Sequence, residues 1–416
     1  MAVVMPAASS ASSKFSSSPP PSHCYGVRVI AEIGRYNDYS YISSSSRNII
    51  KCKSIFLQSP LSSSLHSISC RSSSTSLLPL THHNDGIQSL FQILPTDLRD
   101  ILLCDPNQSQ LLEVVLDLGK LPQACYAGDS GRQVLRNTQV TWQELEYAQN
   151  AIGTFGDDNR AGIAGTLHRI SAIRSREGAV IGLTCRVGRA IQGHICMVRD
   201  LLDFGESILF IGRPGVGKTT VIREISRVLA DELHKRVVIV DTNNEIGGEG
   251  DIPHPAIGDA RRLQVYKPSV QHLVMSEAVE NHMPEVIIVD EIGTEAEVNA
   301  CCSIAQRGVM LIATAHGEVL ENIVKNPILA DMIGGVKSVT LGGHEARLRQ
   351  SKKTILQRRA YPAFGFLIEI RERHYWVVHR TARSVDLFLS GRKPLVEIRR
   401  RDEDSNVIIE RWRTES

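Results

Sequence analysis

The residues with the clearest chemical meaning lie in one nine-residue run near the middle of the 416-residue chain. The run fits the pattern G-x-x-x-x-G-K-[ST], in which backbone N–H groups surround an anion and a lysine reaches phosphate oxygens. Its members are Gly212, Arg213, Pro214, Gly215, Val216, Gly217, Lys218, Thr219 and Thr220. The pattern predicts that the run binds the phosphates of a nucleotide, with Lys218 at the β- and γ-phosphates and the Thr219 hydroxyl as a ligand of Mg²⁺.

The segments on both sides of this run have the composition that a phosphate-binding loop requires. Residues 207–211 form a short apolar run typical of a buried strand, and residues 219–229 carry apolar side chains at helical spacing. A helix that begins at the loop adds partial positive charge where the phosphates bind. The order strand, glycine loop, helix therefore favours phosphate binding over a chance glycine-rich turn.

Acidic residues follow two other apolar runs. Residues 285–289 are followed by Asp290 and Glu291, about 70 residues after the loop. We expect Asp290 to hold Mg²⁺ and Glu291 to orient the attacking water. Residues 237–240 precede Glu245, which would also lie at the carboxyl edge of a parallel sheet, where ligands bind. The residues themselves do not choose between Glu245 and Glu291 as the catalytic base.

A fourth apolar run, residues 310–313, is followed by Thr314 and His316. We expect this strand to lie between the strand before the phosphate loop and the strand of Asp290. Either side chain would then be placed to sense a γ-phosphate. A structural role for the histidine is the alternative.

Composition limits the functional classes. The sequence has no run of 18 or more apolar residues, so no transmembrane helix is predicted. None of the nine cysteines forms C-x-x-C, so neither a zinc site nor a disulfide framework is predicted. The net charge is +2, but residues 1–80 hold seven of the 47 Lys and Arg and only two of the 45 acids. The rest is slightly acidic, and bulk charge gives no argument for nucleic-acid binding.

Residues 1–80 are rich in serine and poor in acids, which is typical of an organelle transit peptide. Ala2 and the low arginine content favour a plastid over a mitochondrion. Cleavage is expected between about 50 and 85. The alternative is a disordered tail without a targeting role.

The remaining pattern predicts an N-terminal α+β domain over residues 87–200 and an α/β core with a mainly parallel sheet over 201–395. A charged tail, expected to be frayed, would follow over 396–416. In the first domain we expect a helix over 90–98 and another that begins at a Thr141/Glu144 capping box and runs to about Ile152. A hairpin is expected over 366–379, either at the end of the core or in a small appended sheet.

Residues 167–174 and 179–187 alternate around a glycine turn and predict another hairpin. It carries the basic residues His168, Arg169, Arg174, Arg176, Arg186 and Arg189. A solvated basic face and a phosphate or nucleotide contact are both open for them.

The motifs together resemble a known family, the stage III sporulation protein AA-like P-loop ATPases. The resemblance depends on residues 166–174, 182–189, 241–245, 277–284, 290–294, 314–317 and 333–335. It covers roughly residues 90–395. It is closest to the plastid and cyanobacterial branch, a hypothetical chloroplast open reading frame family whose nuclear-encoded plant members include one named for plastid development.

The resemblance implies a RecA-like core related to secretion ATPases, which act as rings. In that group the acid at the position of Glu245 is the catalytic base, so the resemblance favours Glu245 over Glu291. Neighbouring subunits supply arginines in such rings, and Arg186, Arg189, Arg261 and Arg262 are the candidates here.

Three functional hypotheses follow. The first is a plastid Mg²⁺-dependent ATP hydrolase, assembled as a homo-oligomer, that does conformational work on a protein or nucleic-acid client during plastid development. The second is a nucleotide-gated binding module with little hydrolysis. The third is a nucleic-acid-associated ATPase that uses the basic hairpin and the C-terminal arginines. ATP is favoured over GTP because no guanine-reading N-K-x-D follows Asp290.

Overall fold

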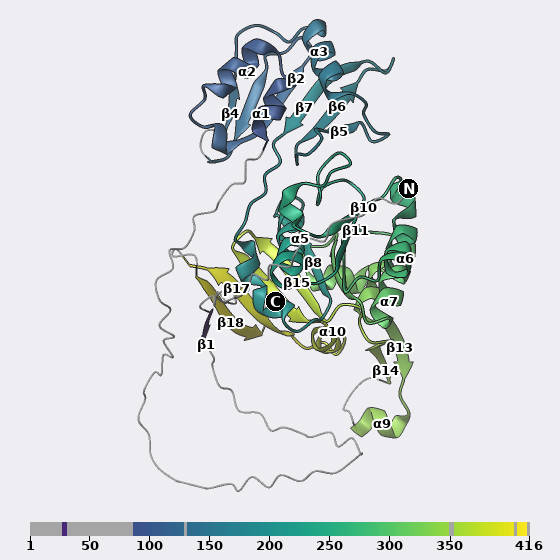
Figure 1. The fold of residues 1–416 in the computed structure, drawn as a ribbon. Coiled ribbons are helices and arrows are strands. Elements are labelled where there is room, and N and C mark those ends of the chain that lie inside the picture. The colour runs from purple at the N-terminus through teal and green to yellow at the C-terminus, as the bar shows by residue number, and fades with distance from the viewer. Residues whose placement is uncertain (1–26, 31–85, 129–130, 349–352, 403–405, 414–416) are drawn as a thin grey trace, which may run out of the picture. The chain divides into compact units, whose positions relative to one another are not determined.

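The structure is a computed structural model that describes residues 27–30, 86–128, 131–348, 353–402 and 406–413 (Figure 1). Residues 27–30 form strand β1 (Val27–Ile30), which pairs in parallel with β18 (Val407–Arg413). The rest of the predicted transit peptide lies outside the described residues.

The N-terminal part contains a six-stranded antiparallel sheet in the order β4-β3-β2-β7-β6-β5. Its strands are β2 (Leu111–Asp117), β3 (Gln123–Tyr126), β4 (Arg132–Val134), β5 (Arg160–Gly162), β6 (Arg169–Arg174) and β7 (Val180–Arg186). Strands β6 and β7 form the expected hairpin. Three helices accompany the sheet: α1 (Ile87–Gln92), α2 (Thr96–Leu103) and α3 (Trp142–Ile152).

Local sequence signals explain two of these helices. Thr141 and Glu144 form the predicted capping box at the start of α3, each bonding the other's backbone N–H. The single helix expected over residues 90–98 is wrong, because the chain forms α1 and α2 with Pro95 between them. Proline lacks an N–H donor and disfavours helical geometry in the residue before it, so the first helix ends there.

The second sheet has ten strands in the order β1-β18-β17-β16-β15-β8-β12-β11-β9-β10. Its strands besides β1 and β18 are β8 (Ile208–Gly212), β9 (Val237–Asp241), β10 (Arg261–Gln264), β11 (Val286–Ile292), β12 (Met310–Ala315), β15 (Phe366–Glu372), β16 (Tyr375–Arg380) and β17 (Leu395–Arg401). Its helices are α4 (Arg199–Leu202), α5 (Lys218–Arg227), α6 (Gln271–His282), α7 (Glu295–Gln306), α8 (Leu320–Lys325) and α10 (Thr381–Leu389).

The ten-stranded sheet is mixed, which corrects the expectation of a mainly parallel core. Strands β15, β8, β12, β11, β9 and β10 pair in parallel. Strands β15 to β18 are joined by antiparallel pairings instead. The predicted hairpin 366–379 is therefore the junction, because β15 is parallel to β8 and antiparallel to β16. The chain is α/β with a parallel half and an antiparallel half.

Alternate side chains of the parallel strands enter two apolar cores. One core contains Ile208, Phe210 and Ile312 together with Val221 and Ile222 of α5. The other contains residues of the opposite parity, with apolar side chains of α6, α7 and α10. Because strands buried on both faces need apolar residues at every position, these segments read as continuous apolar runs in the sequence.

The charged tail 396–416, expected to be frayed, instead contains β18 and all but the first residue of β17. Arg399 is buried, and its guanidinium pairs with Asp200 at 2.5 Å and with Glu397 at 3.0 Å. A buried arginine is tolerated when its donors are paired in this way. The basic run therefore belongs to the sheet.

A separate two-stranded antiparallel ribbon joins β13 (Val336–Thr340) and β14 (Thr354–Arg358), with α9 (Gly343–Leu348) between them. Among the described residues, no helix is long and apolar enough to cross a membrane.

Candidate nucleotide-binding site

Four neighbouring strands bring the predicted site residues to one edge of the large sheet. Strand β12 lies between β8 and β11, as expected, and β9 follows β11. The glycine loop leaves β8, Glu245 follows β9, Asp290 lies in β11, and Thr314 lies in β12. Since parallel strands end at the same edge, side chains far apart in sequence converge there.

These residues line a cleft of ≈ 1350 Å³. Its lining includes Glu245, Asp290, Glu291, Thr314 and His316. Of the glycine loop, Pro214, Gly215, Gly217, Lys218, Thr219 and Thr220 line it, whereas Gly212, Arg213 and Val216 do not. Residues of the N-terminal sheet, Arg169 and Arg186 among them, line the same cleft.

The glycine loop has the backbone that its residues predict. Gly212, Gly215 and Gly217 have φ of 153°, 80° and 103°, in the region that favours glycine, and α5 begins at Lys218. The Lys218 ammonium donates to the carbonyl oxygens of Gly212 at 2.7 Å and Arg213 at 3.1 Å. Burial lowers the pKa of Lys218, although nearby carboxylates oppose this. A phosphate would give this ammonium an anionic partner.

Asp290 is a buried carboxylate among other acids. Burial, together with the charges of Glu245, Asp241 and Glu291, raises the pKa of Asp290 well above its usual range. A divalent cation would compensate that charge, and Mg²⁺ characteristically takes one or two carboxylates plus phosphate oxygens. No group of three or more metal-ligating side chains occurs among the described residues. The donor set thus fits Mg²⁺ bound together with a phosphate ligand.

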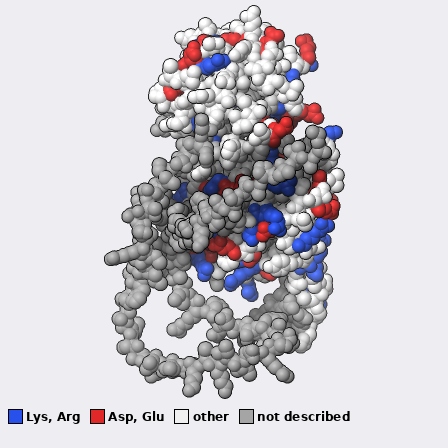
Figure 2. Space-filling model, in the orientation of Figure 1, with Lys and Arg blue, Asp and Glu red and all other residues white. Residues whose placement is uncertain are grey.

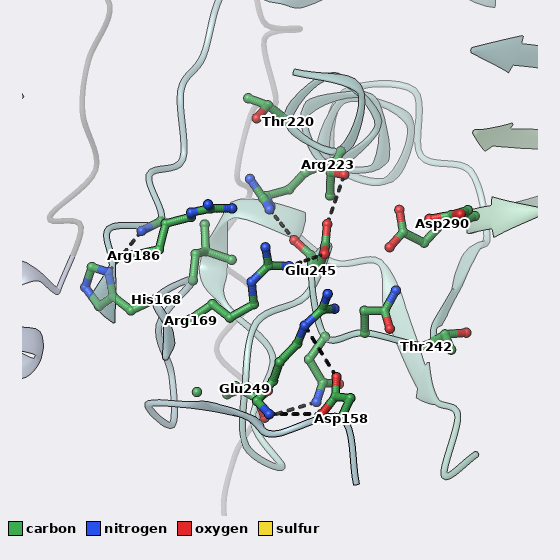
Figure 3. Close-up of a pocket in the computed structure, with 18 of the residues that line it drawn as sticks. Asp158, His168, Arg169, Arg186, Thr220, Arg223, Thr242, Glu245, Glu249 and Asp290 are labelled. Atoms are coloured by element: carbon green, nitrogen blue, oxygen red, sulfur yellow. Dashed lines mark hydrogen bonds and ion pairs between the residues drawn. The ribbon is translucent and has the colours of Figure 1, made fainter. Parts of the chain in front are cut away.

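Two arginines hold Glu245, as Figure 3 shows. The Arg169 guanidinium donates to Glu245 Oε1 at 2.6 Å, and Thr219 Oγ1 lies 3.4 Å from Glu245 Oε2. Arg223 of α5 donates to the backbone carbonyls of Glu245 and of Ile246, the latter at 2.8 Å. The carboxylate expected to act as base therefore adjoins the hydroxyl expected to ligate Mg²⁺.

Glu291 has a different environment. Its carboxylate contacts Nε2 of His316, and both side chains are exposed, by 42% and 65%. The Glu291 carbonyl accepts from Gln271 at 2.8 Å. Thr314 is buried, and its hydroxyl donates to the Asp290 carbonyl at 2.6 Å. Glu291 and His316 thus form one exposed pair, while Thr314 supports the backbone of Asp290.

Comparisons with known proteins show the family to which the chain belongs. The family described as "Sporulation stage III, protein AA" matches residues 167–340. Uncharacterized protein ycf45 of Cyanidium caldarium is 44% identical over 316 residues, which cover 76% of this chain and 94% of that protein. The chain belongs to this family, in its plastid and cyanobacterial branch.

Two longer relatives are more similar in sequence. Uncharacterized protein ycf45 of Porphyra purpurea is 54% identical over 80% of this chain and 59% of its own length. Protein SEEDLING PLASTID DEVELOPMENT 1 of Arabidopsis thaliana is 53% identical over 84% of this chain and 50% of its own length. The chain thus matches only about half the length of these two relatives.

The four arginines expected to serve a neighbouring subunit differ from one another in their contacts and exposure. Arg189 donates to the carbonyls of Leu111 at 2.6 Å and Gln108 at 3.1 Å. Arg262 donates to carbonyls of the segment 247–250. Arg186 lines the cleft with a side chain that is 57% exposed, and Arg261 is exposed outside it. Arg189 and Arg262 support their own chain, which leaves Arg186 and Arg261 as the candidates.

Sequence reasoning missed Arg223 and did not connect Arg169 with Glu245. Arg223 occupies a buried position of α5 beside Val221, Ile222 and Ile225, where burial lowers its pKa to about 10. A charged residue among apolar helix positions was the available signal, because a buried charge needs partners. The contact of Arg169 joins two sheets, and no local pattern reports such a pairing.

Proposed function

We propose that this chain is a Mg²⁺-dependent ATP hydrolase with a RecA-like core. The observation that carries the proposal is the convergence of Lys218, Thr219, Glu245 and Asp290 on one cleft at the edge of β8, β9 and β11. A lysine, a hydroxyl, a buried carboxylate and a second acid are the parts that phosphoryl transfer to water requires. The position of β12 between β8 and β11 supports the RecA-like assignment.

In this proposal each side chain has one task. The loop amides and Lys218 bind the β- and γ-phosphates, and Thr219 and Asp290 hold Mg²⁺. When bound, Mg²⁺ neutralises charge on the phosphate oxygens. Glu245 accepts a hydrogen bond from the attacking water, because it adjoins Thr219, whereas Glu291 is engaged by His316. Thr314 holds the backbone of Asp290, and His316 faces the same cleft.

We further propose that the protein acts in the plastid as a homo-oligomer whose ATP cycle does conformational work during plastid development. The name of the Arabidopsis relative and the serine-rich residues 1–80 support the location and the process. Arg261 supports assembly, because it is exposed and lies outside the lining of its own chain's cleft.

The described arginines weigh against a nucleic-acid-associated ATPase. Arg169, Arg174 and Arg189 of the basic hairpin region bind groups of the same chain, and so does Arg399 near the C-terminus. On the face that Figure 2 shows, acidic side chains lie among the basic ones over the described part of the surface. A protein that binds along a nucleic-acid strand requires basic side chains that are free to contact the phosphates of that strand.

The test is ATP hydrolysis by the full chain with Mg²⁺. Wild type should turn over ATP, and Lys218→Ala should abolish nucleotide binding and turnover. Lys235→Ala, which removes a surface lysine paired with Glu285, is the matched control and should behave as wild type. Glu245→Gln should lower kcat by about 10²–10⁴-fold with ATP binding retained, and Glu291→Gln by less than about tenfold.

Two results would change the proposal. A larger loss in Glu291→Gln than in Glu245→Gln would reverse the two acids' roles. Tight ATP binding without turnover in wild type would replace the hydrolase with the nucleotide-gated binding module.

A further inference from the structure

The loop that carries Glu245 is bonded to the N-terminal sheet. Ala164 and Glu249 form a parallel bridge, in which the Gly165 N–H donates to the Glu249 carbonyl at 2.9 Å. The Glu249 N–H donates to the Thr166 carbonyl at 3.2 Å. At Gly248, where φ is +76°, a Cβ atom would lie 2.6 Å from the Thr166 carbonyl oxygen, so the approach requires glycine. Backbone of the segment 164–166 thus directly supports the loop.

Arg169 extends this support to the functional carboxylate. It lies at the start of β6, three residues beyond Thr166, and its guanidinium binds Glu245 Oε1 at 2.6 Å. The other carboxylate oxygen faces Thr219 Oγ1 at 3.4 Å. One oxygen of Glu245 is therefore held by a cation from the N-terminal sheet, and the second is directed to the expected phosphate and Mg²⁺ site.

Arg223 and Arg169 divide the support of Glu245 between backbone and side chain. Arg223 is buried and donates to the Glu245 backbone carbonyl, so it fixes where the chain lies. Arg169 and Glu245 are about one-third exposed at the side chain, and their contact fixes the carboxylate's rotation. A base that is itself oriented by a third group is a recurring arrangement in catalytic sites.

We propose that Arg169 is a positioning residue for Glu245, so that the N-terminal sheet sets the orientation of the catalytic base. The inference deepens the proposed function and rests on it. In hydrolysis the water oxygen forms a bond to the γ-phosphorus, and the bond from that phosphorus to the oxygen of ADP breaks. The leaving oxygen keeps the electron pair, and the proton of the water passes to Glu245 Oε2.

The chemistry explains why an arginine suits this place. The transition state of phosphoryl transfer is loose, so the carboxylate contributes chiefly by orienting water. When one carboxylate oxygen is bound to a guanidinium, the second oxygen has a fixed direction in which to accept from water. Small errors in such positioning cost large factors in rate.

Arg169→Ala, Arg169→Lys and Arg174→Ala test the proposal in the full chain. Arg174 lies on the same strand, but it bonds Asn159 and Gly178 of the N-terminal sheet, so its loss is the matched control. Arg169→Ala should lower kcat about 10- to 100-fold with KM and the Kd for Mg²⁺·ATP unchanged. Arg169→Lys should recover part of kcat, and Arg174→Ala should keep it.

A second readout needs no nucleotide. Thermal unfolding of Arg169→Ala, Glu245→Gln and the double variant should give non-additive shifts in Tm, since the second substitution removes a contact that is already lost. Additive shifts, or an unchanged kcat in Arg169→Ala with an active wild type, would overturn this inference alone. A rise in KM at constant kcat would also overturn it, because Arg169 would then only bind substrate. Absence of Lys218-dependent turnover in wild type would overturn the proposed function as well.

Discussion

Asp290 combines a functional position with an unfavourable environment. Its carboxylate is buried next to the acids Glu245, Asp241 and Glu291, and burial is the largest cause of its raised pKa. A group whose pKa is raised in the folded state binds protons more readily there than in the unfolded chain. Its contribution to stability is therefore lost as pH rises through the folded pKa. Where this carboxyl is ionised, the nucleotide-free protein bears the free-energy cost of the buried charge.

We predict that Asp290→Asn stabilises the nucleotide-free protein while removing Mg²⁺-dependent turnover. Each kcal/mol regained should raise Tm by about 2–4 °C at neutral pH. The gap to wild type should narrow as pH falls, because the wild-type carboxyl becomes protonated. Differential scanning calorimetry across pH 5–9 measures this, with the exposed Asp203→Asn as control. A Tm below wild type at every pH would contradict the prediction.

The residues predictable from sequence were those whose meaning is local. The run 212–220 has a fixed spacing, and Asp290 directly follows an apolar run, so both could be located without a structure. The contact of Arg169 with Glu245 spans 76 positions and joins β6 of the N-terminal sheet to the loop after β9. Neither residue type nor spacing encodes such a contact, because it depends on how the sheets meet.

The elements show the same division. The capping box of α3 and the hairpin β6–β7 follow from neighbouring residues and were predicted. The strands β17 and β18 were not, because Arg399, Arg400 and Arg401 suggest a solvated tail. Their burial depends on partners elsewhere, since Arg399 pairs with Asp200 of α4 and Arg401 contacts Gly193. Charge patterns predict exposure only when such partners are absent.

Gly212 is the position where the phosphate loop meets the strand beside it. It ends β8 with φ of 153°, and an added Cβ would lie 2.5 Å from the carbonyl oxygen of Ile370 in β15. Its own carbonyl accepts from Lys218. Gly212 and Ile370 are paired backbone positions of β8 and β15. Neither can move without disturbing this pairing, which also places the Gly212 carbonyl that Lys218 contacts.

We predict that Gly212→Ala lowers the free energy of unfolding by about 1–3 kcal/mol and weakens nucleotide binding. Urea denaturation and nucleotide titration measure the two effects. Gly342→Ala is the control, because its φ is unstrained and a Cβ there meets nothing within 4 Å. Equal stability of the two variants would contradict the prediction, because it would show that the backbone of β8 and β15 shifts to accommodate the added Cβ.

At the scale of the molecule, the sequence predicts the hairpin 366–379 but not that β15 joins it to the parallel strands in one mixed sheet. The apolar runs of β8, β9, β11 and β12 indicate strands buried on both faces, which is typical of parallel pairing. The runs of β15 and β16 have the same character, yet β16 is antiparallel to β15. A short turn after β15 allows only the antiparallel return, and the mixed sheet follows from that connection.

Arg186 and Arg261, the two candidate arginines for assembly, differ in their position relative to the cleft. Arg186 lines the cleft of its own chain, whereas Arg261 is exposed and outside that lining, which suits Arg261 to the cleft of a second copy. We predict that Arg261→Ala loses turnover but binds ATP, and that wild-type specific activity rises with protein concentration. Mixing Arg261→Ala with Lys218→Ala should restore activity above either alone, because a Lys218→Ala subunit still offers its Arg261 to an intact phosphate loop.

The comparison with Arg186→Ala decides where the arginine comes from. If Arg186 acts within its own chain, Arg186→Ala subunits have a defective cleft. Mixing them with Lys218→Ala, whose cleft is also defective, should then restore nothing. Recovery in that mixture, together with full activity of Arg261→Ala, would move the shared role to Arg186. No recovery in either mixture would mean that each chain completes its own site, and the homo-oligomer would lose its catalytic argument.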